Sequence, residues 1–182
     1  MSDELIINWW KERAERLDTG VSNQDLSAEQ LAAFFAQQVD HSYISHGELQ
    51  IGRAIDSEHW SPDLVQLVAE EIKGARENGS PSALRIVTAA VESRLAAMAL
   101  VNFHKGLHSC YVVLEDLVVD KALRHQGIGV ALLTWIEQQT RSAGCRQIYL
   151  ESGITNHDAH RFFERHGFRP CSIVMMKSVD DD

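Results

Sequence analysis

Hydrophobic positions recur every three to four residues in several parts of the chain, which is the spacing of an amphipathic helix. Polar residues able to cap a helix stand before most of these parts: Ser27 with Gln30 and Thr155 with Asp158 have capping-box spacing. The expected helices are residues 4–18, a segment capped by Ser27, one capped by Ser61 and ended by Asn78-Gly79, one between Gly127 and Gly144, and residues 155–167.

Elsewhere the apolar positions alternate or run together over short stretches bounded by turn residues, which is typical of strands. The expected strands are residues 49–55, 83–91, 94–104, 109–120, 146–152 and 168–178. Short turns join the second, third and fourth of these strands, so the pattern predicts an antiparallel meander. We therefore expect a helical N-terminal extension at residues 1–46 and an α+β core domain at residues 47–182.

Charge and composition narrow the class of protein. The chain has 182 residues, a net charge of −9 and 45% hydrophobic residues. It shows no basic stripe of the kind that nucleic-acid binding requires, and no run of about 18 apolar residues that would cross a membrane. The polar start of the chain is unlike a secretory leader, so we expect a cytoplasmic protein. Three cysteines, 110, 145 and 171, are an odd number without close pairing, and we expect reduced thiols.

The stretch RHQGIGVALLTWIEQQ, residues 124–139, places two glycines at the mouth of a predicted helix. The first turn of a helix has unpaired N–H groups and a partial positive charge, and glycine lets a ligand approach the backbone closely. These properties predict an anion site suited to phosphate, to which the Arg124 side chain adds a positive charge.

Two common phosphate-binding motifs fit this stretch poorly. A Walker A loop needs Lys-Ser/Thr after its second glycine, where this chain has Val130-Ala131. A dinucleotide fingerprint needs a third glycine, where this chain has Leu132, and places its glycines directly after a strand. Glu151 lies about 20 residues further on at a strand end, which keeps the dinucleotide alternative open.

Two segments in register resemble the GNAT superfamily of N-acetyltransferases. LVVDKALRHQGIGVALL, residues 117–133, is similar to the family's acetyl-CoA-binding motif, and NHDAHRFFERHGF, residues 156–168, is similar to its later Asn-x-x-Ala segment. The resemblance implies an α/β sandwich with a mixed, mostly antiparallel central sheet flanked by helices. It extends from about residue 48 to the end, so the helical N-terminal segment is an addition to the family's minimal fold.

The resemblance also implies where acetyl-CoA would bind. The backbone of Leu117, Val118 and Val119 would pair with the pantetheine arm, and Asn156 would reach the pantetheine or the loop beside it. Phe163 stands where the family often has a tyrosine. The pyrophosphate would be held by the amides of Arg124, His125, Gln126, Gly127, Ile128, Gly129 and Val130.

The implied reaction is the direct attack of an amine on the thioester, for which a carboxylate must accept a proton. Glu115 and Asp116 are neighbours on a strand and should point to opposite faces, so one of them should face the cleft; Glu115 is our candidate base. A strand N–H, that of Val118 or Val119, would stabilise the oxyanion. Because Phe163 has no hydroxyl, the acid that protonates the thiolate is open among Tyr149, Cys145 and water.

The remaining polar and aromatic clusters have more than one interpretation. Histidines at 157, 160 and 166, and His104 and His108 beside Cys110, have spacings seen in zinc sites, but nine histidines produce such spacings by chance, and no metal site is predicted. His160 is a candidate substrate contact. Three interpretations stay open for the aromatic residues near the N-terminus: packing on the core, covering the acceptor site, or forming a homodimer contact. These residues are Trp9, Trp10, Phe34 and Phe35.

The sequence thus predicts an acetyl-CoA-dependent N-acetyltransferase acting on a primary amine, that of a small molecule being favoured over a peptide or protein amine. Direct attack in a ternary complex is the expected mechanism. The alternative hypothesis is an acyl-CoA-binding sensor or interaction module that has lost turnover, which Phe163 and the N-terminal segment keep open. The sequence leaves the acceptor amine and the natural acyl group undetermined.

Overall fold

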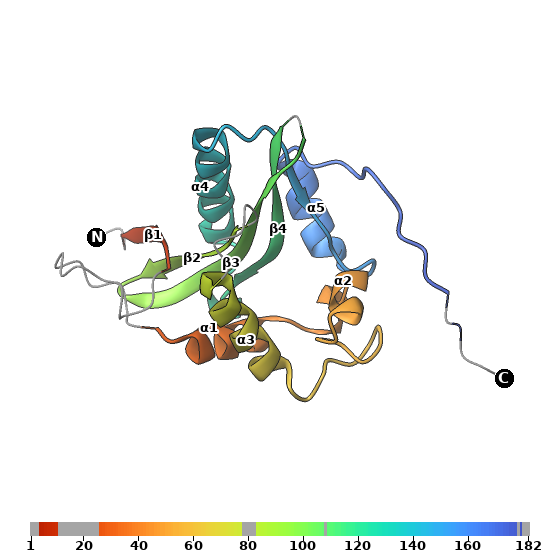
Figure 1. Cartoon of the computed structure of the whole chain (residues 1–182). Helices are drawn as coiled ribbons and strands as arrows, with labels where there is room; N and C mark the ends of the chain where they lie inside the picture. Colours follow the sequence, from red (N-terminus) through yellow and green to blue (C-terminus); the bar gives the residue numbers. More distant parts are fainter. Residues whose placement is uncertain (1–3, 11–25, 78–82, 108, 178, 180–182) are drawn as a thin grey trace.

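The structure, a computed structural model, describes residues 4–10, 26–77, 83–107, 109–177 and 179. One five-stranded sheet in the order β1-β2-β3-β4-β5 forms its centre (Figure 1). The first four strands pair antiparallel and β4 pairs with β5 in parallel. The strands are β1 Leu5–Trp9, β2 Ala83–Val91, β3 Arg94–Lys105, β4 Cys110–Val119 and β5 Ile148–Leu150. The predicted meander and the mixed, mostly antiparallel sheet are confirmed.

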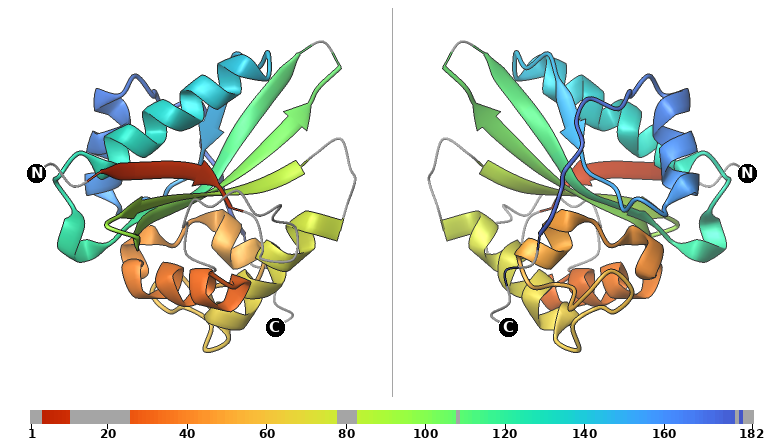
Figure 2. Two further views of the ribbon diagram at one scale, coloured as in Figure 1. Left: turned by 90° about the vertical axis from the view of Figure 1, so that its left-hand side faces the viewer. Right: turned by 90° about the vertical axis from the view of Figure 1, so that its right-hand side faces the viewer.

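Helices cover both faces of the sheet (Figure 2). On one face lie α1 and α3, and on the other α4 and α5. The helices are α1 Ala28–Gln38, α2 His46–Gln50, α3 Leu64–Glu77, α4 Ile128–Ser142 and α5 His157–Arg165, with 3₁₀ turns at His41–Tyr43 and Lys121–Leu123. This arrangement is the α/β sandwich expected from the sequence.

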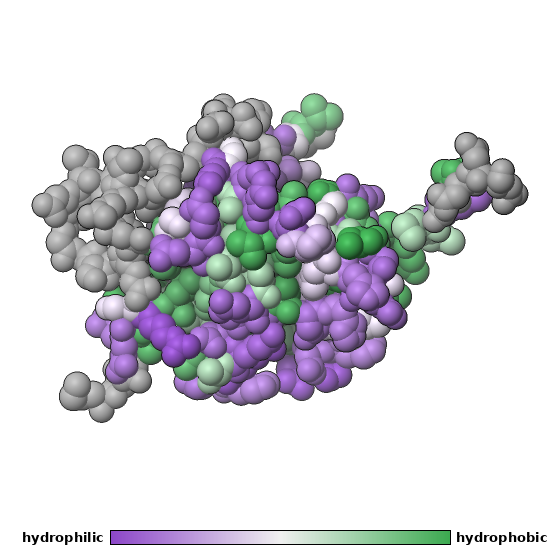
Figure 3. Space-filling model, turned by 90° about the horizontal axis from the view of Figure 1, so that it is seen from below, coloured by the Kyte–Doolittle hydropathy of each residue, from purple (hydrophilic) through white to green (hydrophobic). Residues whose placement is uncertain are grey.

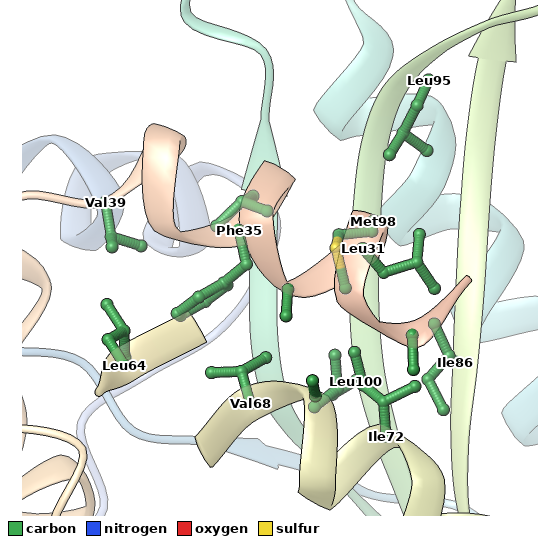
Figure 4. Close-up of a cluster of buried hydrophobic side chains, with 14 residues drawn as sticks. Leu31, Phe35, Val39, Leu64, Val68, Ile72, Ile86, Leu95, Met98 and Leu100 are labelled. Carbon is green, nitrogen blue, oxygen red and sulfur yellow. The ribbon is translucent and has the colours of Figure 1, made fainter. Parts of the chain in front are cut away.

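The core has two layers because β3 is buried on both faces. On one side, Leu31 and Phe35 of α1 meet Val68 of α3 and Met98 and Leu100 of β3, all fully buried (Figure 4). On the other side, side chains of α4 and α5 pack against alternate residues of the same strands. Helix α1, which precedes residue 46, therefore shares one hydrophobic cluster with the predicted core domain.

The helix predicted over residues 4–18 is wrong at residues 5–9, which form strand β1; residues 11–18 lie outside the described part of the chain. Leu5 pairs with Val91 and Trp9 with Val87, so the segment extends the sheet at its β2 edge. A short apolar run such as LIINW suits either a helix or a strand, and the open edge of β2 decides between them.

Three further predictions are corrected. Residues 49–55 are not a strand: α2 ends at Gln50, and the chain then turns through Gly52 at φ +76°. Helix α3 starts at Leu64, after rather than at the predicted Ser61-Pro62. The cap of α5 is Asn156, whose side chain accepts a hydrogen bond from the amide of Ala159, rather than Thr155. The capping box of Ser27 and Gln30 is confirmed.

The strand predicted at residues 168–178 does not form in the part described, residues 168–177. This segment leaves the body of the protein after α5 and projects into solvent (Figure 3). Ile173 is 89% exposed and Met175 is 91% exposed. The apolar alternation is therefore present, but in this single chain no neighbouring strand pairs with it.

The cysteine prediction is also wrong for two of the three residues. Cys110, at the start of β4, and Cys145, just after α4, form a disulfide, while Cys171 is free and exposed. The two partners are 35 positions apart in sequence, and the packing of α4 on the sheet brings their Cα atoms to 4.7 Å. Among the described residues, no helix combines the length and apolar character needed to cross a membrane.

Candidate active site

Strands β4 and β5 pair only briefly, over Val112–Leu114 and Ile148–Leu150. Just beyond this pairing, Leu100 of β3 faces Asp116 while Val101 faces Leu114, so Glu115 is an extra, bulged residue on β4. A bulge bends its strand and interrupts the alternation of side chains. The outer edge of β4 after Glu115 is therefore not covered by β5.

Backbone amides on this edge point away from the sheet. The amide of Leu117 donates to the Tyr43 hydroxyl at 3.2 Å, whereas the amide of Asp120 donates to the carbonyl of Ala96 on β3 at 2.8 Å. Since amide direction alternates along a strand, the amide of Val119 points the same way as that of Leu117. Val119 thus presents an N–H group on the open edge.

A cavity of about 260 Å³ opens beside the bulge. Its walls come from the segment around α2, from α3, from the end of the β4–β5 pairing and from α5. Carboxylates are the main charged groups in the wall: Glu48, Glu71, Glu115, Asp116 and Glu151. Both Glu115 and Asp116 line the cavity, which the bulge explains, because strict alternation would have placed them on opposite faces.

One guanidinium lies among three of these carboxylates. Arg53, whose side chain is 4% exposed, donates to Asp116 Oδ2 at 2.9 Å and to Glu71, and lies 3.5 Å from Glu48 Oε2. The Tyr43 hydroxyl donates to the other Asp116 oxygen at 2.9 Å. The buried charge of Asp116 is thereby paired and hydrogen-bonded on both oxygens, as a buried carboxylate must be.

Burial raises the pKa of Glu48 to about 7, with help from the negative charge of Asp116 and against the opposing effect of Arg53. Burial also raises the pKa of Glu71, again opposed by Arg53. The pKa of the Tyr43 hydroxyl is well above its usual value because of burial and the Asp116 charge. The cavity therefore holds a carboxyl group that exchanges its proton near neutral pH, a property typical of functional sites.

This shift makes stability depend on pH. The Glu48 carboxyl binds a proton more tightly in the folded protein than in the unfolded chain, where its pKa is about 4.5. Its contribution to stability is therefore fully present below pH 4.5 and is lost as the pH rises through about 7. We expect thermal denaturation at pH 8 to give a Tm several degrees below that at pH 5.5. Glu48→Gln should flatten this difference, and a higher Tm at pH 8 would contradict the assignment.

Loss of the Tyr43 hydroxyl should destabilise the protein. Tyr43→Phe leaves Asp116 Oδ1 and the Leu117 amide without their partner in a buried site, which costs about 1–3 kcal/mol. Chemical denaturation measures this cost. The matched control is Tyr149→Phe, because Tyr149 is 40% exposed and its ring packs on Tyr111 outside the cavity. Equal stability losses in the two variants would show that the Tyr43 contacts contribute nothing.

At the far end of the open edge, helix α4 begins with Gly127 as its N-cap, at φ +83° and without a side-chain cap. His125 also has positive φ, at 64°. A Cβ on Gly129 would lie 3.5 Å from Val119 and 3.6 Å from Phe162, so the helix mouth packs closely on β4 and α5. Its first-turn amides have no partner inside the helix, and this is the geometry of an anion site.

Comparison with known proteins identifies the fold. The sequence model of the acetyltransferase (GNAT) family matches residues 49–168, more than half of the chain. The chain belongs to the GNAT family. A solved structure of the aminoglycoside N-acetyltransferase AAC(6')-Iy in complex with CoA superimposes with a TM-score of 0.61 at 14% identity, covering 98% of this chain and 96% of the other.

Two curated relatives are more similar in sequence. The aminoalkylphosphonate N-acetyltransferase of Salmonella typhimurium is 31% identical over 86 residues, which are 45% of this chain and 56% of the relative. The uncharacterized N-acetyltransferase YhdJ of Bacillus subtilis is 34% identical over 91 residues, 50% of this chain and 62% of the relative. The matches thus span somewhat more than half the length of these two relatives.

Only part of the GNAT-like residue set lines the cavity. Glu115, Leu117, Asn156 and Phe163 do so, whereas Tyr149 does not. Glu115 is exposed and accepts a hydrogen bond from the Asn102 side chain at 3.2 Å. The amide of Leu117 is bonded to Tyr43, which leaves that of Val119 as the outward-pointing amide in the predicted pantetheine stretch. Val118, Val119 and residues 124–130 lie outside the cavity wall.

The Arg124 side chain, predicted to add a positive charge at the phosphate site, contacts the end of α1 in this structure. Its guanidinium donates to the carbonyls of Val119 at 3.3 Å and of Gln38 at 2.9 Å, rather than standing free above the helix mouth. Lys121 donates in the same way to the carbonyl of Gln37 at 2.8 Å. Both cations thus satisfy carbonyls at the C-terminal end of α1, a favourable place for positive charge. The backbone amides remain the donors at the helix mouth.

Among the cavity residues that the sequence did not predict are the members of the buried polar cluster around Asp116: Tyr43, Glu48, Arg53 and Glu71. Three of them lie between residues 43 and 53, a stretch without strong periodicity whose second half was assigned to a strand. Glu71 reads as an ordinary exposed residue of helix α3. One local signal in the sequence could have indicated these residues: two opposite charges, Glu48 and Arg53, lie on either side of the apolar Leu49 and Ile51.

Proposed function

We propose that this GNAT protein is an acetyl-CoA-dependent N-acetyltransferase that acts on a primary amine of a small molecule in a ternary complex. One observation carries the proposal: the open edge of β4 runs from an acidic cavity at Glu115 toward the glycine-capped mouth of α4. A thioester whose long arm ends in a pyrophosphate fits such a track, because its reactive end would reach the cavity while its phosphates meet the helix amides.

The backbone supplies the binding groups for acetyl-CoA. The pantetheine arm would lie along Leu117–Val119, and the amides of residues 124–130 would hold the pyrophosphate. Asn156 lines the cavity beside this path while its side chain caps α5, so its position is well defined. The Val119 amide on the open edge supports its assignment as the donor that stabilises the oxyanion.

Glu48 is a better candidate for the base than Glu115. A general base works best when its pKa is near the operating pH, and burial raises the pKa of Glu48 to about 7. The carboxylate takes a proton from the ammonium directly or through one water. The amine lone pair then attacks the thioester carbon, the C–S bond breaks, and the CoA thiolate leaves.

Phe163 lines the cavity but has no hydroxyl to protonate that thiolate. A thiol has a pKa of about 8.5, so its thiolate is a tolerable leaving group without an acid. A protonated Glu48 carboxyl can also return its proton to the thiolate. The second proton that the nitrogen loses as the amide forms passes to water, which balances the reaction. The proposal therefore needs neither Tyr149 nor Cys145, and Cys145 is already bonded to Cys110.

The proposal is tested by incubating the protein with acetyl-CoA and a panel of primary amines. Release of free thiol together with the mass of an N-acetylated amine is the expected result. Binding of acetyl-CoA without thiol release for any amine would instead support an acyl-CoA-binding module. Absence of acetyl-CoA binding would overturn both.

A further inference from the structure

We propose that the acceptor carries a second positively charged nitrogen, as a diamine or polyamine does, and that Glu115 and Glu151 bind it. The inference rests on the proposed N-acetyltransferase function and specifies the acceptor. It follows from how the charges in the cavity wall are paired.

Arg53 is the lone lysine or arginine among the described residues that line the cavity. Its guanidinium is buried and already contacts Asp116, Glu71 and Glu48. Three carboxylates around one guanidinium more than balance its positive charge, so Arg53 leaves no net positive charge for an incoming anion. An acceptor bearing a phosphonate or carboxylate would therefore meet a negative wall without a compensating cation.

Glu115 and Glu151 are the two wall carboxylates that Arg53 does not contact. Glu115 accepts a hydrogen bond from the neutral Asn102 amide. Glu151 has a side chain that is 53% exposed and lies 3.2 Å from His46 Nδ1, which carries charge only when protonated. Glu115 lies in β4 just after its pairing with β5 ends, Glu151 directly follows β5, and both are exposed residues that line the cavity.

Glu48 provides an independent sign that the cavity is built for a donor. The residue is 6% exposed, and its Oε2 accepts no hydrogen bond from the described part of the chain, although it lies 3.5 Å from Arg53. A buried carboxylate oxygen without a hydrogen bond is costly, and an N–H group of a bound amine would satisfy it. The reacting nitrogen would thus contact Glu48, and the second nitrogen would contact Glu115 and Glu151.

This charge pattern separates the chain from one of its relatives. The Salmonella typhimurium protein is named for an aminoalkylphosphonate, a substrate class with an anionic group. In this chain the described residues of the cavity wall include five carboxylates and one guanidinium. The sequence similarity to the Salmonella typhimurium protein is therefore no reason to expect that this chain binds an anionic substrate.

The test compares three acceptors with the same four-carbon chain: 1,4-diaminobutane, butylamine and 4-aminobutanoate. Steady-state rates with saturating acetyl-CoA should give a kcat/KM for the diamine at least about tenfold above the other two. Added salt should reduce that preference, because part of it is Coulombic. An equal or higher kcat/KM for butylamine or 4-aminobutanoate would overturn the inference and leave the proposed function intact.

Two variants locate the second ammonium. Glu115→Gln and Glu151→Gln should each lower the ratio of kcat/KM for the diamine to that for butylamine by several-fold. Glu164→Gln makes the same change on an exposed residue of α5 outside the cavity wall and should keep the ratio. An unchanged ratio in both cavity variants would overturn the assignment.

Failure of the chemistry is distinguishable from failure of this inference. If acetyl-CoA binds and no amine releases thiol, the proposed function is wrong. Calorimetry of the CoA-loaded protein with the same three ligands then tests the charge preference directly. Tighter binding of the diamine would still support the inference, and equal or absent binding of all three would overturn it.

Discussion

Gly127→Asp should weaken acetyl-CoA binding by about 100-fold or more, roughly 2.7 kcal/mol. Gly127 caps α4 at φ +83°, a conformation that side chains other than glycine adopt with strain. The new carboxylate would stand at the helix mouth, where it would occupy the amides proposed for the pyrophosphate and repel its charge. Isothermal titration of acetyl-CoA into wild type and variant measures the change.

Two controls separate charge from strain. Gly127→Ala introduces the strain without the charge and should retain most of the affinity. Gly144→Asp places the same charge on a glycine with φ +77° at the opposite end of α4, where a Cβ meets no atom within 4 Å, and should bind acetyl-CoA like wild type. If Gly127→Asp binds as tightly as Gly144→Asp, the helix mouth does not hold the pyrophosphate.

Glu48→Gln should lower kcat by about 10²–10⁴-fold, the usual cost of losing a general base. The substitution keeps the shape of the side chain and removes its ability to accept a proton. Butylamine is the suitable acceptor for this measurement, because it has no second positive charge that Glu115 and Glu151 could bind. Glu115→Gln is the comparison, and a larger loss of kcat in that variant would return the role of base to Glu115.

The pH dependence of kcat/KM provides a second measurement of the same role. Since burial raises the pKa of Glu48 to about 7, the active carboxylate form accumulates as pH rises through that value. The wild-type rate should therefore increase between pH 6 and 8, with an apparent pKa near 7, and this limb should be missing in Glu48→Gln. A wild-type profile that is flat across this range would exclude Glu48 as the base.

Local signals account for most of the correctly predicted fold. The meander from β2 to β4 follows from apolar runs separated by short turns, and these strands pair with their immediate neighbours in the chain. Helix α4 follows from its apolar stripe between Gly127 and Gly144, and α1 from the capping box at Ser27. Each of these features involves residues a few positions apart, so the sequence contains the necessary information.

The two GNAT-like segments were recognisable for the same reason. The glycines of residues 124–130 and the Asn156 cap act through backbone geometry at the start of a helix, and a linear motif encodes that geometry directly. From the sequence alone, therefore, came the family, the meander and the glycine-capped start of α4, while the phosphate site assigned there stays a prediction.

Tertiary packing decided what depends on distant segments. Residues 5–9 became a strand because β2 offered an open edge, and Cys110 met Cys145 because α4 lies against the sheet. The bulge at Glu115 arises from the register between β3 and β4. Because of it, the neighbouring carboxylates of Glu115 and Asp116 both line the cavity. No local pattern marks such a register shift, because it depends on both strands at once.

The acidic cavity belongs wholly to the tertiary structure. Arg53, Glu71 and Asp116 come from three separate elements, and only their burial together pairs the charges and leaves Glu48 with a pKa near 7. The sequence determined that the chain is a GNAT protein and that α4 begins at a glycine, the place for which a phosphate site is predicted. The fold determined which carboxylates line the cavity and how their charges are paired, because solvation and charge pairing are properties of the surroundings of a side chain rather than of its position in the chain.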